Sequence, residues 1–113
     1  MTSETLRKLF AAILDNIELM PHVRLNYEPH ARYQEAYSVW LFNTKIATIC
    51  LRETIYPVHE YYNLTITADP WTFTSVSLKD AGIPIAIKPT SVAEAVEYIQ
   101  ALIDLYGVME QET

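Results

Sequence analysis

The sequence is poor in the residues that form covalent cross-links, tight backbone loops and membrane spans. Its 113 residues include one cysteine, Cys50, and two glycines. A single cysteine excludes a disulfide within the chain, and two glycines leave little backbone freedom for a phosphate-binding loop. No apolar run approaches the roughly 18 residues of a membrane-spanning helix, and the first residues lack the pattern of a secretion signal. We therefore expect a cytoplasmic protein in which Cys50 is a buried side chain without a chemical role.

The sequence also lacks the motifs by which enzymes and cofactor sites are usually recognised. It contains no phosphate-binding loop, dinucleotide fingerprint, nucleophile elbow or zinc-protease helix motif. The three histidines, His22, His30 and His59, have no metal-ligand spacing to one another or to Cys50. We therefore expect no catalytic residues, no metal and no cofactor, and we interpret the chain as a non-enzyme.

Basic residues are missing from the C-terminal part of the chain. All 8 basic residues lie at or before Lys88, whereas 5 of the 14 acidic residues follow it. The net charge of −6 therefore belongs mainly to the C-terminal segment. Nucleic acids and anionic membranes bind through Lys and Arg, so an acidic chain argues against both as direct partners. A protein with a basic surface suits this charge better.

Hydrophobic residues make up 50% of the sequence and charged residues 19%, which is the balance of a packed globular domain. The length suits one domain over residues 1–113. Internal repeats, low-complexity runs and linkers are absent from the sequence. The chain should therefore fold as one unit around one core.

Two amphipathic patterns predict helices at the ends of the chain. Residues 4–19 carry an apolar stripe at helical spacing, and a proline follows them. Residues 92–106 carry a second stripe. Ser91 followed three residues later by Glu94 is a capping box that marks the start of this helix. Gly107 is expected to end it.

Alternating apolar and polar residues predict strands between the two helices. Residues 53–60 contain a proline and are expected to form a loop, and residues 83–88 form at most an edge strand. The pattern predicts an α+β fold, with an antiparallel sheet of about five strands in hairpins and an amphipathic helix at each terminus. The predicted strands are residues 22–28, 36–42, 45–52, 61–68 and 71–78.

The central hairpin is the best marked part of this predicted sheet. Asn43 and Thr44 are expected to form a two-residue loop between the strands. This register places Val39 opposite Thr48 and leaves both faces of the strand pair largely apolar. Such a pair needs cover on both sides, so Trp40 is predicted to be a core residue.

Two predicted surfaces are candidates for binding a partner. The C-terminal helix should present an acidic solvent face, and several of the eight tyrosines fall in or near the strands. Tyrosine suits interfaces because it combines a large contact area with a polar tip, although it is also a good strand former that can simply line a sheet. The residues suggested for partner binding are Glu94, Glu97, Asp104, Tyr56, Tyr61 and Tyr62.

These observations favour a small acidic protein-binding module, such as an inhibitor, adaptor or immunity-type protein acting on a partner with a basic surface. A mimic of nucleic-acid charge is a minor variant of this interpretation. A first alternative is a small-ligand-binding protein or enzyme with a pocket between sheet and helices, using His59, Tyr61 or Glu35. A second alternative is a homodimeric structural protein in which another copy covers the second apolar face of the sheet.

Overall fold

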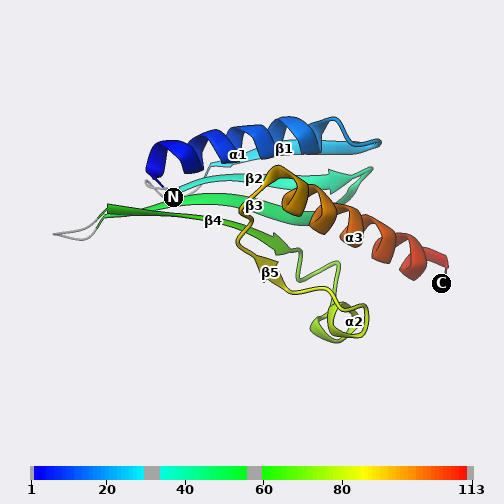
Figure 1. The fold of residues 1–113 in the computed structure, drawn as a ribbon. Coiled ribbons are helices and arrows are strands. Elements are labelled where there is room, and N and C mark those ends of the chain that lie inside the picture. Colours follow the sequence, from blue (N-terminus) through cyan, green and yellow to red (C-terminus); the bar gives the residue numbers. More distant parts are fainter. Residues whose placement is uncertain (1, 30–33, 56–59, 112–113) are drawn as a thin grey trace.

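A computed structural model describes residues 2–29, 34–55 and 60–111 of the chain (Figure 1). It contains five antiparallel strands in one sheet, in the order β1-β2-β3-β4-β5, so each strand pairs with the strands next to it along the chain. The α+β fold and the helices at both ends are confirmed. The elements are α1 (Ser3–Glu18), β1 (Val23–Pro29), β2 (Gln34–Leu41), β3 (Thr44–Ile55), β4 (Glu60–Ala68), α2 (Ser75–Asp80), β5 (Ala86–Ile87) and α3 (Val92–Gln111).

The two long helices pack their apolar stripes against the same face of the sheet and against each other. The ring of Phe10 in α1 lies 6.0 Å from that of Tyr37 in β2. In α3, Ile99 and Leu102 are fully buried, as is Ile13 in α1. The core is therefore a single layer between this helix pair and one sheet face.

Polar caps fix where the helices begin. The Thr2 hydroxyl accepts a hydrogen bond from the Thr5 backbone N–H at 3.1 Å and starts α1. At α3 the Ser91 hydroxyl accepts from the Glu94 backbone N–H at 3.1 Å, as the capping box predicts. The Glu94 carboxylate reaches back to the backbone N–H of Thr90 at 3.1 Å and to its hydroxyl at 2.9 Å. Glu94 is thus part of the cap.

The predicted end of the last helix is wrong. Gly107 lies inside α3, which continues to Gln111. Tyr106 and Met109, on either side of this glycine, pack against the core. Their burial outweighs the roughly 1 kcal/mol that a glycine costs in a helix interior.

The predicted register of the central hairpin is also wrong. The loop residues are Phe42 and Asn43, because Leu41 pairs with Thr44. An irregularity between Val39 and Trp40 then moves the pairing one residue back, so the register beyond it differs from the predicted one by one residue. Val39 therefore lies opposite Ala47 instead of Thr48. A one-residue shift moves every side chain of a strand to the other face.

This shift makes one sheet face apolar and the other largely polar. Val39, Ala47 and Ile49 share the face that α1 and α3 cover, and all three are fully buried. Trp40 lies on the opposite face and is half-buried, so its predicted place under cover is wrong. The opposite face carries Arg24, Asn26, Glu28, Ala36, Ser38, Trp40, Thr48, Cys50, Arg52, Asn63, Thr65 and Thr67.

Polar contacts support the opposite face where the helices do not. The Trp40 indole N–H donates to the Ser38 hydroxyl at 2.7 Å, and that hydroxyl lies 2.7 Å from a Glu28 carboxylate oxygen. The Arg24 guanidinium lies 5.3 Å from the centre of the Trp40 ring. Cys50 is half-buried here instead of fully buried, and desolvation raises the pKa of its thiol.

Two more predictions for the strands need correction. Residues 71–78 form a turn and α2 instead of a strand, because the Asp69 carboxylate accepts hydrogen bonds from the backbone N–H groups of Trp71 and Thr72, and Thr74 caps α2. The predicted loop at residues 53–60 is partly strand, since β3 runs to Ile55 and β4 starts at Glu60. Residues 56–59 lie outside the described parts of the chain.

Candidate binding pocket

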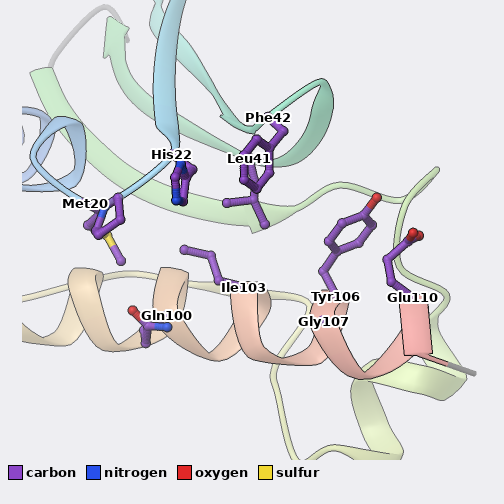
Figure 2. A pocket seen from close by; sticks show the side chains of 10 residues that line it. Met20, His22, Leu41, Phe42, Gln100, Ile103, Tyr106, Gly107 and Glu110 are labelled. Atoms are coloured by element: carbon purple, nitrogen blue, oxygen red, sulfur yellow. The ribbon is translucent and has the colours of Figure 1, made fainter.

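An apolar pocket opens at one end of the sheet, between α3 and the turns that join the strands. We call this the hairpin end: β1 and β3 begin there, and β2 and β4 end there. The cavity has a volume of about 390 Å³. Figure 2 shows its walls, with α3 on one side and the sheet turns on the other. The lining residues are Met20, Pro21, His22, Leu41, Phe42, Gln100, Ile103, Tyr106, Gly107 and Glu110.

The sheet side of the pocket is held by two residues with unusual backbones. His22 has φ 65° and Phe42 has φ 54°, a left-handed conformation that residues other than glycine seldom adopt. The Phe42 backbone N–H donates to the His22 carbonyl at 3.1 Å. Their rings stack at 4.6 Å. Such strain persists only where the surroundings enforce it, and it is most common at binding sites.

The α3 side of the pocket combines apolar side chains with a few polar groups. Ile103 and Tyr106 project from the helix toward the sheet (Figure 2). Tyr106 is fixed by a 3.0 Å hydrogen bond between its hydroxyl and that of Thr44 at the start of β3. Gln100 donates to the Asp104 carboxylate at 2.9 Å. Gly107 has no side chain, which leaves room in this wall.

Exposed apolar side chains surround the same end of the molecule. Trp71, in the turn after β4, is 95% exposed, and Phe42 is 62% exposed. Leu19 follows α1, and Val108 lies in the last turns of α3, which reach beyond the strands in Figure 1. Val76 and Ile85 are also exposed and line a separate hollow beside α2. Tyr27 is 53% exposed and lies near the middle of β1, opposite Tyr37.

The predicted tyrosine surface is not part of this pocket. Tyr62 is half-buried on the helix-covered face, where its hydroxyl donates to Glu53 at 3.1 Å and the Arg7 guanidinium lies 5.4 Å from its ring. Tyr61 lies in β4 opposite Thr54. Tyr56 falls outside the described residues.

The predicted acidic surface divides into two parts. Glu94 is half-buried and engaged in the α3 cap. Glu97 and Asp104 are exposed, and Asp104 accepts the hydrogen bond from Gln100 beside the pocket.

The residues suggested for a ligand pocket or enzyme are not among the lining residues either. Glu35 forms an ion pair with Arg7 at 3.3 Å, away from the pocket. His59 lies outside the described residues. Within the described ranges, no three His, Cys, Asp or Glu side chains come together as a metal site would require.

Sequence reasoning missed the pocket, although one signal was present. The segment from Leu102 to Met109 is apolar at positions that extend beyond a single stripe, which indicates a helix with a second surface to cover. No sequence pattern indicates the positive φ of Phe42, because this backbone conformation depends on the hairpin register.

Comparisons with protein-family models, curated protein sequences and solved structures find no match to this chain. In the described part of the chain, no helix combines the length and apolar character that crossing a bilayer requires.

Proposed function

We propose that the chain is a protein-binding module, acting as an inhibitor, adaptor or immunity-type protein, that docks its partner on the hairpin end. The observation that carries this proposal is the gathering of exposed apolar side chains around an apolar pocket. A monomeric protein seldom exposes several large apolar side chains at one end, because their exposure to water is unfavourable. Phe42 and Trp71 have the aromatic character that dominates binding energy at protein interfaces.

The pocket itself suits an apolar anchor from the partner. Its walls are built before the partner arrives, by the Thr44 to Tyr106 hydrogen bond and the His22 to Phe42 stack. A site that is already ordered loses less conformational entropy on binding. The strained backbones at this rim are consistent with a structure kept for binding at some cost in stability.

The charge near the pocket supports a partner with basic groups beside its anchor. Glu110 lines the cavity, and Asp104 is exposed two helical turns from the end of α3. No lysine or arginine follows Lys88. Attraction between this acidic helix and a basic surface would speed association at low salt.

Site-specific photo-crosslinking in the native cell tests this proposal. A benzophenone amino acid replaces Phe42 or Val108 at the hairpin end, and Tyr27 in the matched control, since it is 53% exposed but lies outside the pocket, near the middle of β1. We expect positions 42 and 108 to form adducts with one discrete protein other than a second copy of this chain, and we expect position 27 not to form that adduct. Absence of the adduct at positions 42 and 108, or an equal yield of the same adduct at position 27, would overturn the proposal.

A second candidate is a site for a small apolar ligand. The observation that favours it is the cavity volume of about 390 Å³, which falls within the range of small-molecule sites. A ligand that binds the folded state raises the melting temperature by mass action. We would screen apolar and aromatic metabolites by thermal shift. A compound that raises the melting temperature of the parent but not that of Ile103→Trp, in which a larger side chain fills the cavity, would be assigned to this cavity.

A further inference from the structure

The outer edge of the sheet is formed by β1, whose backbone groups alternate between β2 and the open side. The His22 carbonyl accepts from the Phe42 N–H, so residue 22 faces β2, and alternation directs Arg24, Asn26 and Glu28 the same way. Leu25 and Tyr27 therefore direct their N–H and C=O groups away from the sheet.

At both ends of β1, the backbone groups on this open edge cannot accept a further strand. The Val23 N–H already donates to the Met20 carbonyl at 3.3 Å, and Pro29 has no N–H to offer. The groups free to form a complete hydrogen-bonded pair belong to Leu25 and Tyr27, which lie symmetrically about Asn26. An edge of this kind is a template for another strand.

We propose that two copies of this chain pair antiparallel through β1, with the two-fold axis at Asn26. In this register Leu25 of each copy exchanges both backbone hydrogen bonds with Tyr27 of the other. If the register shifts by two residues so that Tyr27 lies opposite Val23 of the other copy, the Tyr27 carbonyl has no donor, because the Val23 N–H is engaged. If it shifts the other way, Leu25 lies opposite Pro29, and the Leu25 carbonyl has no donor because proline lacks an N–H.

The side chains of β1 match in the same register. Arg24 of one copy lies opposite Glu28 of the other, twice by symmetry, on the polar face of the sheet. Leu25 lies opposite Tyr27 on the helix-covered face, where an apolar and an aromatic side chain pack well. Charges on edge strands usually prevent pairing. Here Arg24 and Glu28 carry opposite charges on either side of Asn26, so this strand best fits a second copy of itself.

The register makes a specific cross-linking prediction. Asn26 would face its own symmetry mate in a non-hydrogen-bonded pair, with Cα atoms about 4.5 Å apart. In a Cys50→Ala background, Asn26→Cys should form an intermolecular disulfide under mild oxidation. Arg24→Cys alone and Glu28→Cys alone should not, whereas the double variant Arg24→Cys/Glu28→Cys should. Asn26→Cys that cross-links no faster than either single control would overturn the proposal.

Charge exchange provides an independent test by analytical ultracentrifugation. Arg24→Glu, or Glu28→Arg, places like charges opposite each other and should raise the dimer dissociation constant about tenfold or more. The double variant Arg24→Glu/Glu28→Arg restores opposite charges and should restore the dimer. Ser38→Ala is the control, because it disturbs the same contacts to Glu28 and Trp40 without changing charge.

Circular dichroism and thermal melting would verify that each variant is folded. A parent protein that sediments as a monomer at every concentration, or a charge-exchanged double variant that dimerises no better than the single variants, would overturn the proposal. This test does not depend on the hairpin end, so either proposal can fail without the other.

Discussion

At the scale of single residues, the two glycines have opposite effects on the backbone. Gly82 has φ 72° and closes α2, with its N–H donating to the Lys79 carbonyl at 3.0 Å. Gly107 lies in the interior of α3, and apart from its chain neighbours and the surrounding helix backbone no atom lies within 4 Å of the place where a Cβ would be.

We expect Gly107→Ala to raise the free energy of unfolding by about 0.5 to 1 kcal/mol, because alanine loses less backbone entropy in a helix. Gly82→Ala is the matched comparison and should lower it by about 1 to 2 kcal/mol, because a Cβ disfavours the left-handed backbone. Urea unfolding measures both. A loss of stability in Gly107→Ala would show that α3 needs this glycine for a bend or for the shape of the pocket.

Tyr98 ties α3 to the segment before β5. Its hydroxyl donates to the Pro84 carbonyl at 2.6 Å, with the Ile85 carbonyl at 3.0 Å, and burial raises its pKa to about 12. Because the folded pKa lies above the unfolded value of about 10, this group contributes its full stability below pH 10. That contribution is lost as the pH rises through about 12.

We expect the ultraviolet titration of the parent to contain an ionisation near pH 12, and we expect Tyr98→Phe to remove it. The substitution should cost about 0.5 to 1.5 kcal/mol at neutral pH, the worth of a hydrogen bond. Tyr27→Phe, at a 53% exposed position, is the matched control for the loss of one tyrosine hydroxyl. If Tyr98→Phe did not alter the alkaline part of the curve, the assignment would be wrong.

At the scale of elements, the sequence predicts element type better than register. The amphipathic stripes of both helices and the Ser91 cap are local patterns, and each was confirmed. The hairpin register depends on a positive φ at Phe42 and on the irregularity after Val39, neither of which follows from residue type. The Thr-rich stretch after Asp69 has strand-forming composition, yet the Thr72 hydroxyl donates to the Lys45 carbonyl and to the Asp69 carboxylate, and the Thr74 hydroxyl caps α2. Local hydrogen bonding there overrides β propensity.

The corrected register changes what Trp40 should contribute. On the polar face it is half-buried and held by Ser38 and Arg24, so Trp40→Ala should cost about 1 to 2 kcal/mol. Ile49→Ala, at a fully buried position on the other face, should cost about 2 to 5 kcal/mol. Thermal and urea unfolding compare the two. Equal losses would mean that the polar face is covered in solution.

The acidic side chains of α3 should separate in the same way. Glu94→Lys removes the group that accepts two hydrogen bonds from Thr90 and should cost about 0.5 to 2 kcal/mol. Glu97→Lys/Asp104→Lys changes exposed charges only and should leave stability within about 0.5 kcal/mol of the parent. Circular dichroism melts measure both. Only the double variant is then suitable for testing whether the acidic helix meets a basic partner, by comparing capture at two salt concentrations.

At the scale of the whole molecule, binding and stability should be separable at Phe42. Phe42→Asn removes the exposed ring but keeps a residue that tolerates a left-handed backbone. We expect the free energy of unfolding to stay level or to rise by up to about 1 kcal/mol, while affinity for the cross-linked partner falls at least about tenfold. Tyr27→Asn is the control and should leave that affinity unchanged. A variant that binds as tightly as the parent would remove Phe42 from the interface.

The site was harder to predict than the fold because it is assembled from segments far apart in the chain. His22, Phe42 and Tyr106 meet only when the turns of the sheet and the end of α3 come together. The surfaces that the sequence suggested were those with an obvious local pattern, namely acidic residues and tyrosines. Such patterns mark exposure or strand propensity, whereas a pocket depends on distant contacts.

The packing of α1 against α3 also bears on how the chain is made. The sheet can assemble strand by strand during synthesis, since each strand pairs with the one just before it. The packing of α1, however, is complete only after α3 has been synthesised, because Ile13 and Ile17 share a core with Ile99 and Leu102. Its apolar stripe therefore lacks its final partner until α3 has left the ribosome. Protection of the nascent chain by a chaperone would matter most during that interval.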